Sequence, residues 1–365
     1  MLLFAILLRP EQVKRNRVDG ILIAKFNNMK IRYLIKLFPV GASMLVSGCC
    51  DDEVFTVPEG ENAEMTVCAD IATARTRTVA DDSFDTNDAI GVFLLDNNTN
   101  SPLSTGDMAK YSNCKYIYDG TSFKGADITN TVYFGDESVY RVAAYYPFNV
   151  SGTSFSIDTS VSGGSLTQTQ ENQNKNLDIL VSNSVQTGKS ALNVEFKGDN
   201  AFRHVMSKLV LVFSAGEDGG FSDSDEINDI LENMKFEMTG LHFKGTVDMG
   251  KYPKDGVFGI FTLTDKGSIV IDDTQTGVNS EFSDNQKRIT LLLIPQTSDA
   301  TIGISYTESD GTAVSFKSQP FTLNLDSGRE YVLPVTITKK GLQIGSAEIN
   351  DFTSSGASVE IGTLK

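Results

Sequence analysis

Residues 205–214 read VMSKLVLVFS, and this stretch decides the class of fold. Every second residue from Val205 to Phe213 falls on one face of an extended strand, and Lys208 falls on the other face. The β-branched and aromatic side chains suit a pleated surface that is partly buried. The stretch therefore predicts a β-strand that packs one face against a core.

The same period of two recurs along most of the chain, with breaks rich in Gly and polar residues. This pattern is typical of antiparallel β-sandwiches, so we expect an all-β protein. The clearest further strands are expected at 89–95, 139–146, 191–197, 288–294, 300–307, 313–317, 321–325 and 331–338.

One helix is expected in the second half of the chain. Its apolar residues follow a spacing of i, i+3, i+4 and i+7 behind the caps Ser222 and Ser224: Ile227, Ile230, Leu231 and Met234. The acidic residues at 223, 225 and 226 suit the positive end of a helix dipole. They do not match a calcium loop, because Asn228 and Met234 stand where an EF-hand needs Gly and Glu.

The chain divides into a leader at 1–48 and two β-sandwich domains at 49–188 and 189–365. A polar stretch at 151–176 is expected to form a surface loop of the first domain, and the boundary is placed in 186–190. Translation is expected to begin at Met29, with residues 1–28 a start-site error and 29–48 a lipoprotein signal peptide.

The end of the leader, VSGC at 46–49, resembles a bacterial lipobox, in which the Cys, here Cys49, is lipidated. An ordinary signal peptide that ends near cysteines is the alternative. The acidic residues at 51–53 resemble a signal that exports lipoproteins to the outer face of the outer membrane, although a solvated tether would look the same.

The charge excludes one class of partner. The 365 residues carry a net charge of −16, and removing residues 1–48 leaves 23 basic and 45 acidic residues, a net charge of −22. Such an acidic chain is not expected to bind nucleic acid. Two His and four Cys leave little material for a metal site, and no metal or cofactor is expected; a disulfide between Cys68 and Cys114 is left open.

A catalytic site is not expected either. The sequence contains no GxSxG, HExxH or P-loop motif, and no GxGxxG that follows a strand. His204 is interpreted as a partly buried polar residue at a strand start, and His242 as a residue that alternates toward solvent. Neither has a neighbouring nucleophile, so an enzyme is not expected.

Nine short segments in order resemble the fimbrillin superfamily, the subunits of lipoprotein-derived type V pili. They are 75–78 (RTRT), 83–84 (SF), 88–93 (DAIGVF), 140–148 (YRVAAYYPF), 177–180 (LDIL), 202–209 (FRHVMSKL), 294–297 (IPQT), 327–331 (SGREY) and 349–352 (INDF). One departure is Phe352, where relatives often carry Trp.

The resemblance implies two transthyretin-like sandwiches and assembly by strand exchange on the cell surface. A lipidated precursor reaches the outer membrane, a trypsin-like protease removes the first strand, and a strand from the next subunit replaces it. The product is a head-to-tail fimbrium, in which the subunits are one another's partners. The surface ligand to which such a fibre adheres is not identified.

The residues are compatible with that route. The removable first strand would present Met65, Val67, Ala69 and Ile71 on one face, and cleavage would follow Arg75 or Arg77. The donor strand would present Ala357, Val359 and Ile361. Alternatively, the two arginines are ordinary loop cations and both strands are permanent edge strands.

The second functional hypothesis is a surface lipoprotein that does not polymerise. It would be a fimbrial anchor that keeps its first strand, or a module that binds glycan or protein. A glycan binder is expected to expose an aromatic strip, with Tyr116, Tyr118 or Tyr133 as candidates, because the chain has no Trp.

Overall fold

A computed structural model describes most of the chain after residue 62. The described residues are 15–18, 21–24, 63–72, 83–160, 177–215, 220–221, 224–271, 279–283 and 285–351. Residues 1–48 and 49–365 form separate units. In the first unit, β1 (Arg15–Val18) and β2 (Ile21–Ala24) pair antiparallel. Within the described part of the chain, no helix has the length and apolar character needed to cross a membrane.

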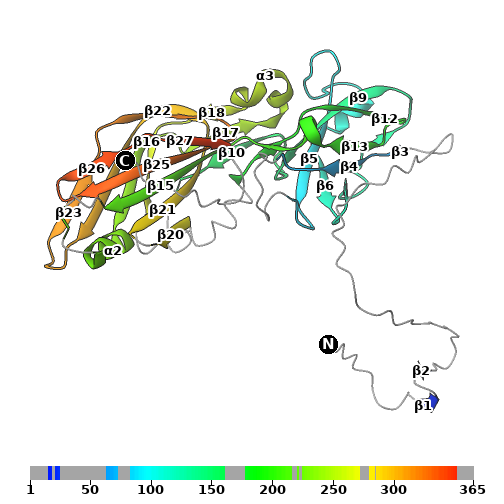
Figure 1. Cartoon of the computed structure of the whole chain (residues 1–365). Helices are drawn as coiled ribbons and strands as arrows, with labels where there is room; N and C mark the ends of the chain where they lie inside the picture. The colour runs from blue at the N-terminus through cyan, green and yellow to red at the C-terminus, as the bar shows by residue number, and fades with distance from the viewer. Residues whose placement is uncertain are drawn as a thin grey trace. The chain divides into compact units, whose positions relative to one another are not determined.

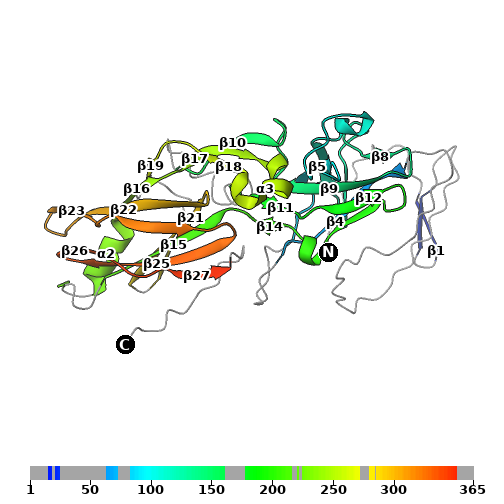
Figure 2. The same ribbon diagram turned by 90° about the horizontal axis from the view of Figure 1, so that it is seen from above.

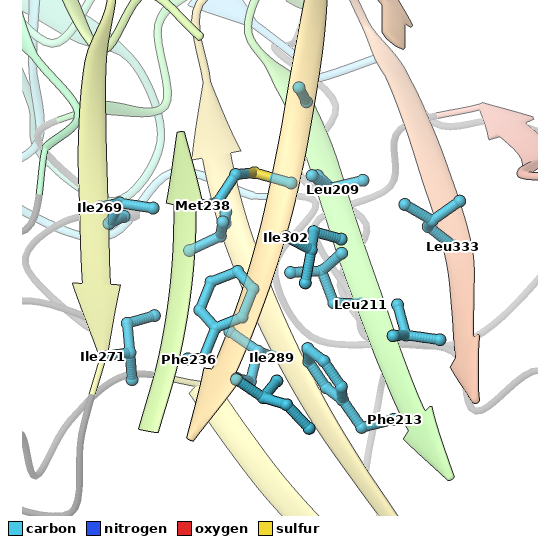
Figure 3. Close-up of a cluster of buried hydrophobic side chains, with 14 of the residues drawn as sticks. Leu209, Leu211, Phe213, Phe236, Met238, Ile269, Ile271, Ile289, Ile302 and Leu333 are labelled. Carbon is cyan, nitrogen blue, oxygen red and sulfur yellow. The ribbon is translucent and has the colours of Figure 1, made fainter. Parts of the chain in front are cut away.

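The stretch that decides the fold forms β15 (Ser207–Ala215), a central strand of the second half. It lies in a six-stranded sheet with β20 (Asn279–Ser283), β21 (Gln286–Leu293), β25 (Arg329–Thr338), β26 (Gly341–Ile344) and β27 (Glu348–Asp351) (Figure 1). Leu209, Leu211 and Phe213 are buried in the core on one side of this sheet, as the alternation predicts (Figure 3).

A five-stranded sheet covers that core from the other side. Its strands are β16 (Lys235–Leu241), β19 (Gly267–Ile271), β22 (Gln296–Thr307), β23 (Ala313–Lys317) and β24 (Phe321–Leu325). Phe236, Met238 and Ile302 from this sheet meet the side chains of β15 in the core (Figure 3). The expected helix is α2 (Ser224–Asn233), and it buries Ile230 and Leu231.

The first half contains a nine-stranded sheet. In order its strands are β13 (Asn193–Phe196), β4 (Thr66–Ala69), β7 (Phe123–Gly125), β6 (Cys114–Tyr118), β5 (Ala89–Leu95), β9 (Val139–Tyr146), β11 (Leu180–Val181) and β14 (Arg203–His204), and β12 (Val185–Gly188) also pairs with β9. Two short strands, β3 (Ala63–Glu64) and β8 (Tyr133–Phe134), form a further pair. The chain is therefore all-β, with two β-sandwiches in tandem.

The strand pairing differs in two places from the division of the chain into domains and loops that the sequence suggested. Residues 154–158 do not belong to a loop: they form β10 (Ser154–Asp158), because Phe155 and Ile157 alternate with polar residues. β10 joins β17 (Lys244–Asp248) and β18 (Phe261–Leu263) of the second half in a three-stranded sheet (Figure 2). Conversely, β13 and β14 follow residue 188 and yet pair in the first sheet, so a boundary near residue 205 fits the pairing better.

The sheets are also not wholly antiparallel. β15 pairs in parallel with β25, and β13 pairs in parallel with β4. Lys208 lies opposite Glu330 in the first of these pairs, and the two side chains form a buried ion pair with 2.7 Å between Nζ and Oε2. Lys208 does lie on the face opposite the core residues, as expected, but it is not solvated there.

The helical content is slightly higher than expected. α3 (Tyr252–Gly259) follows the short 3-10 helix η5 (Met249–Lys251), and further 3-10 turns occupy Asp107–Lys110 and Gly198–Asn200. α3 contains Gly256 at φ +72°, which interrupts its helical backbone. Period-3.6 patterning could not reveal α3, because so short and interrupted a helix presents no sustained apolar stripe.

Candidate functional site

The segment expected to be the first strand, residues 63–72, lies inside the first sandwich rather than at an edge. Its second half, β4, is flanked on one side by β13 and on the other by β7. The parallel register joins Thr66 to Asn193 and Ala69 to Phe196, and Val67 lies opposite Phe123 of β7. Removing this segment would leave unpaired the edges of β13 and β7 that face β4, while β7 would keep β6 on its other side.

Main-chain hydrogen bonds hold the segment along its whole length. Thr66 N donates to Leu192 O at 3.0 Å, and Asp70 N donates to Phe196 O at 3.0 Å. At the end of the segment, Ala72 N donates to Phe202 O at 2.7 Å, and Phe202 N donates to Asp70 O at 2.9 Å. Such bonds depend on backbone atoms, so another extended chain can make them too.

The apolar face of the segment fills a core of aromatic side chains. Met65 and Val67 are fully buried, Ile71 is nearly so, and Ala69 is half-buried at the margin of the same cluster. All four predicted residues therefore share one face. The aromatic residues of this cluster are Phe84, Tyr111, Tyr116, Phe123, Phe134, Phe196 and Phe202.

The segment changes partners at Met65. Before this residue β3 pairs with β8, and after it β4 pairs with β13. At the change, Met65 N donates to Val132 O at 3.0 Å, and the Tyr116 hydroxyl donates to Met65 O at 3.3 Å. The same hydroxyl accepts from Val132 N at 3.0 Å. Burial raises the pKa of Tyr116, so this hydroxyl keeps its proton.

Several predicted residues lie outside the described part of the chain. They are the lipidation residue Cys49, the cleavage residues Arg75 and Arg77, and the donor residues Ala357, Val359 and Ile361. On either side of the two arginines the described chain contacts Phe202. Before them, Ala72 N donates to the carbonyl of Phe202, and after them the ring centroid of Phe84 lies 5.4 Å from that of Phe202.

Other candidate residues serve the fold. His204 Nδ1 lies 2.9 Å from Asp178 Oδ1 in a largely buried position, which agrees with its interpretation as a partly buried polar residue. Cys114 is a free, buried thiol, so the disulfide with Cys68 that the sequence left open does not form. Among the described residues, no group of three or more His, Cys, Asp and Glu side chains could hold a metal ion.

The aromatic strip considered for glycan binding is not present in the expected form. Tyr116 is wholly buried, because its ring belongs to the core and its hydroxyl serves the first strand. Tyr118 and Tyr133 are half-buried. The ring of Tyr118 packs at 4.9 Å from that of Phe123, between centroids. These side chains therefore do not form an exposed shallow strip.

Comparison with known proteins shows which families and structures this chain is similar to. The sequence model of a family described as fimbrillin-like matches residues 76–351. No curated protein sequence matches the chain. The structure is similar to that of a candidate cell adhesion protein from Bacteroides uniformis, with a TM-score of 0.51 and 20% identity over 82% of this chain and 100% of that one. It is also similar to a candidate cell adhesion protein from Bacteroides ovatus, with a TM-score of 0.54 and 20% identity over 81% and 99% of the two chains.

Proposed function

The chain belongs to the fimbrillin-like family, and we propose that it is a structural subunit of an adhesive surface fimbrium that assembles by strand exchange. The role is structural rather than catalytic. The cell adhesion proteins from Bacteroides with a similar fold support a role at the cell surface. The partners of each subunit are further copies or related subunits, joined head to tail.

The observation that carries this proposal is the position of residues 63–72. Its second half, β4, pairs with β13 over four residues and with β7 at Val67, yet the segment holds the first described strands of the second unit. Its loss would expose two strand edges and an aromatic core. Exposed edges of this kind are filled by an added strand, which makes main-chain bonds and places alternate side chains in the core.

Proteolysis after Arg75 or Arg77 would free the segment. Both arginines fall between Ala72 and Ser83, and on either side of them the chain is anchored at Phe202. A cut there would leave Phe84 in the core of the remaining subunit, while residues 49–77 could leave with the first strand. The donor would be the C-terminal stretch that carries Ala357, Val359 and Ile361.

Export as a lipoprotein would bring the precursor to the site of assembly. Cys49 would carry the lipid, and the acidic residues that follow it would direct the protein to the outer face of the outer membrane. Removing residues 49–77 then releases the subunit from its lipid as it opens the edges. One cleavage thus couples release to polymerisation.

The proposal is tested by treating the purified precursor with a trypsin-like protease. We expect loss of the residues before 78, followed by ladders that resist SDS. A variant with both Arg75→Ala and Arg77→Ala should stay uncut and monomeric, whereas Lys340→Ala, which removes an exposed cation elsewhere, should behave like the parent.

A second variant separates cleavage from exchange. Deleting residues 356–365 removes the proposed donor, so this variant should be cut normally and remain monomeric. A precursor that resists the protease altogether would instead be an anchor that keeps its first strand. Clean trimming of the parent without ladders would contradict assembly by strand exchange.

A further inference from the structure

The site has a built-in direction, which is set at Met65. The segment pairs with β8 before this residue and with β13 after it. The main-chain N–H and C=O of Met65 therefore find their partners outside a regular strand ladder. Its N–H meets a carbonyl, Val132 O, and its C=O meets a hydroxyl, Tyr116 Oη. The site thus offers one hydrogen-bond acceptor, the carbonyl of Val132, and one donor, the hydroxyl of Tyr116.

The donor role of Tyr116 is fixed by its surroundings. Its hydroxyl already accepts the N–H of Val132, and its single proton points to Met65 O. The side chain is wholly buried, so water does not replace a missing partner. A chain that runs the opposite way would exchange the positions of N–H and C=O. It would place a carbonyl against the carbonyl of Val132 and leave the Tyr116 proton without an acceptor, and both are unfavourable in a buried site.

The aromatic core and the ladder with β13 distinguish less well between a strand that runs in the observed direction and one that runs the opposite way. Alternate side chains of a strand lie on one face whichever way the strand runs, so a reversed chain can still fill the aromatic core. The observed segment runs parallel to β13, and parallel pairing is slightly the less stable arrangement per residue. The ladder with β13 therefore does not by itself favour the observed direction.

We propose that Tyr116 and the main chain of Val132 select the direction of the incoming strand. The accepted ligand is an extended segment of a second copy of this chain, running parallel to β13 and antiparallel to β7. The residue that takes the place of Met65 must offer both a free N–H and a C=O, which excludes proline there. This inference rests on the proposed function and adds to it a direction and a residue that reads it.

The test adds peptides while the full precursor is being cleaved. The direct probe is biotinylated AEMTVSADIA, which copies residues 63–72 with Cys68→Ser, and the reversed probe is AIDASVTMEA. A third probe is the direct peptide with an N-methyl group on the Met65 nitrogen, which removes the bond to Val132. We expect the wild-type protein to capture the direct probe about tenfold or more above the other two, since each of them loses buried hydrogen bonds.

Two variants assign the preference to one hydroxyl. Tyr116→Phe should lower capture of the direct probe about tenfold and bring it close to that of the reversed probe. Tyr331→Phe is the matched control, because the hydroxyl of the buried Tyr331 also accepts a main-chain N–H, that of Asp326 at 2.8 Å, and Tyr331 belongs to the core of the second half. This control should keep the preference for the direct probe.

The outcomes separate the two proposals. Ladders together with equal capture of direct and reversed probes would overturn the directional reading and leave strand exchange intact. A preference that survives Tyr116→Phe would overturn the role of that residue. Failure of the wild-type protein to capture any probe or to form ladders would overturn strand exchange and the inference with it. If Tyr116→Phe does not fold, the three probes on the wild-type protein still decide the question of direction.

Discussion

Carboxylates of this acidic chain organise several of its loops. Asp96, Asp119, Asp127 and Asp310 each accept a hydrogen bond from the main-chain N–H two residues later. Asp127 is the most heavily used: its side chain accepts from both the N–H and the hydroxyl of Thr129, and from Asn130. These bonds favour the ionised form and lower the pKa of Asp127 to about 2.

The loop that Asp127 organises supports the first-strand site. Asn130 in this loop accepts from Lys115 N at 2.7 Å, which ties the loop to β6. Two residues later the chain reaches Val132, whose main chain bonds both Met65 and Tyr116. The ionisation of the exposed Asp127 carboxylate therefore affects the loop that holds Met65, the residue at which the first strand passes from β8 to β13.

We predict that Asp127 makes the first sandwich sensitive to acid. The pKa of its carboxyl is about 2 in the folded chain and ~3.9 when unfolded, so its contribution to stability is full above about pH 4 and is lost as the pH falls through 2. Asp127→Ala should therefore lower the Tm at pH 6, and the difference from the parent should vanish near pH 2. Thermal unfolding followed from pH 2 to pH 6 measures both.

Asp265→Ala is the control for this prediction. Asp265 is exposed, and within the described ranges its side chain forms no hydrogen bond or ion pair, so its removal should leave the Tm and its dependence on pH unchanged. A difference between Asp127→Ala and the parent that persists undiminished at pH 2 would contradict an electrostatic origin.

At the scale of elements, period-2 patterning located strands well and assigned their partners less well. β5, β9, β23 and β24 have the predicted bounds. β10 was missed because a Ser-rich stretch around Phe155 and Ile157 gives a weak signal. The parallel neighbours of β15 and β4 were not foreseen, because alternation along one strand carries no information about the direction of the next.

The first-strand site was foreseen in part. The alternation of Met65, Val67, Ala69 and Ile71 correctly predicted a shared face. The role of Tyr116 was misjudged, since it was considered as an exposed sugar-binding residue and is wholly buried. A tyrosine within a strand gives no sign of whether its hydroxyl meets solvent or a backbone carbonyl 51 residues away.

We predict that the first strand stabilises the precursor and not the fibre. Met65→Ala leaves a cavity in the aromatic core and should lower the free energy of unfolding of the uncut protein by about 2–5 kcal/mol. If processing removes this strand, fibres formed from Met65→Ala should have the same thermal stability as fibres of the parent. Chemical denaturation of the precursor and heating of the fibres measure the two states.

Glu64→Ala serves as the matched substitution on the same segment. The side chain of Glu64 is exposed, so its loss should change the stability of the precursor by less than about 0.5 kcal/mol. Fibres of Met65→Ala that are weakened as much as the precursor would show that the first strand is retained after assembly.

At the scale of the whole second unit, the two sandwiches share structure. A hydrophobic cluster combines Phe93 and Tyr145 of the first half with Val247, Met249 and Ile260 of the second. The three-stranded sheet is likewise built from both halves, because β10 pairs with β17. In the proposed fibre each subunit would pass tension from one neighbour to the next, and joining the halves by a paired strand would suit that role better than joining them by a single linker.

This shared structure predicts cooperative unfolding. Phe155 of β10 lies opposite Val247 of β17, Lys244 and Asp158 form an ion pair of 3.0 Å, and Thr159 N donates to Phe243 O at 2.7 Å. Neither sandwich can unfold without breaking these contacts, so residues 49–365 should unfold in one calorimetric transition, with equal calorimetric and van't Hoff enthalpies. Ile157→Ser, which places a polar group in the shared cluster, should weaken the coupling and separate the transition into two, whereas Ser156→Ala on the exposed face of β10 should leave it single. Two separate transitions in the parent protein would show that the shared sheet does not couple the halves, and the fibre would then yield first at the junction within each subunit.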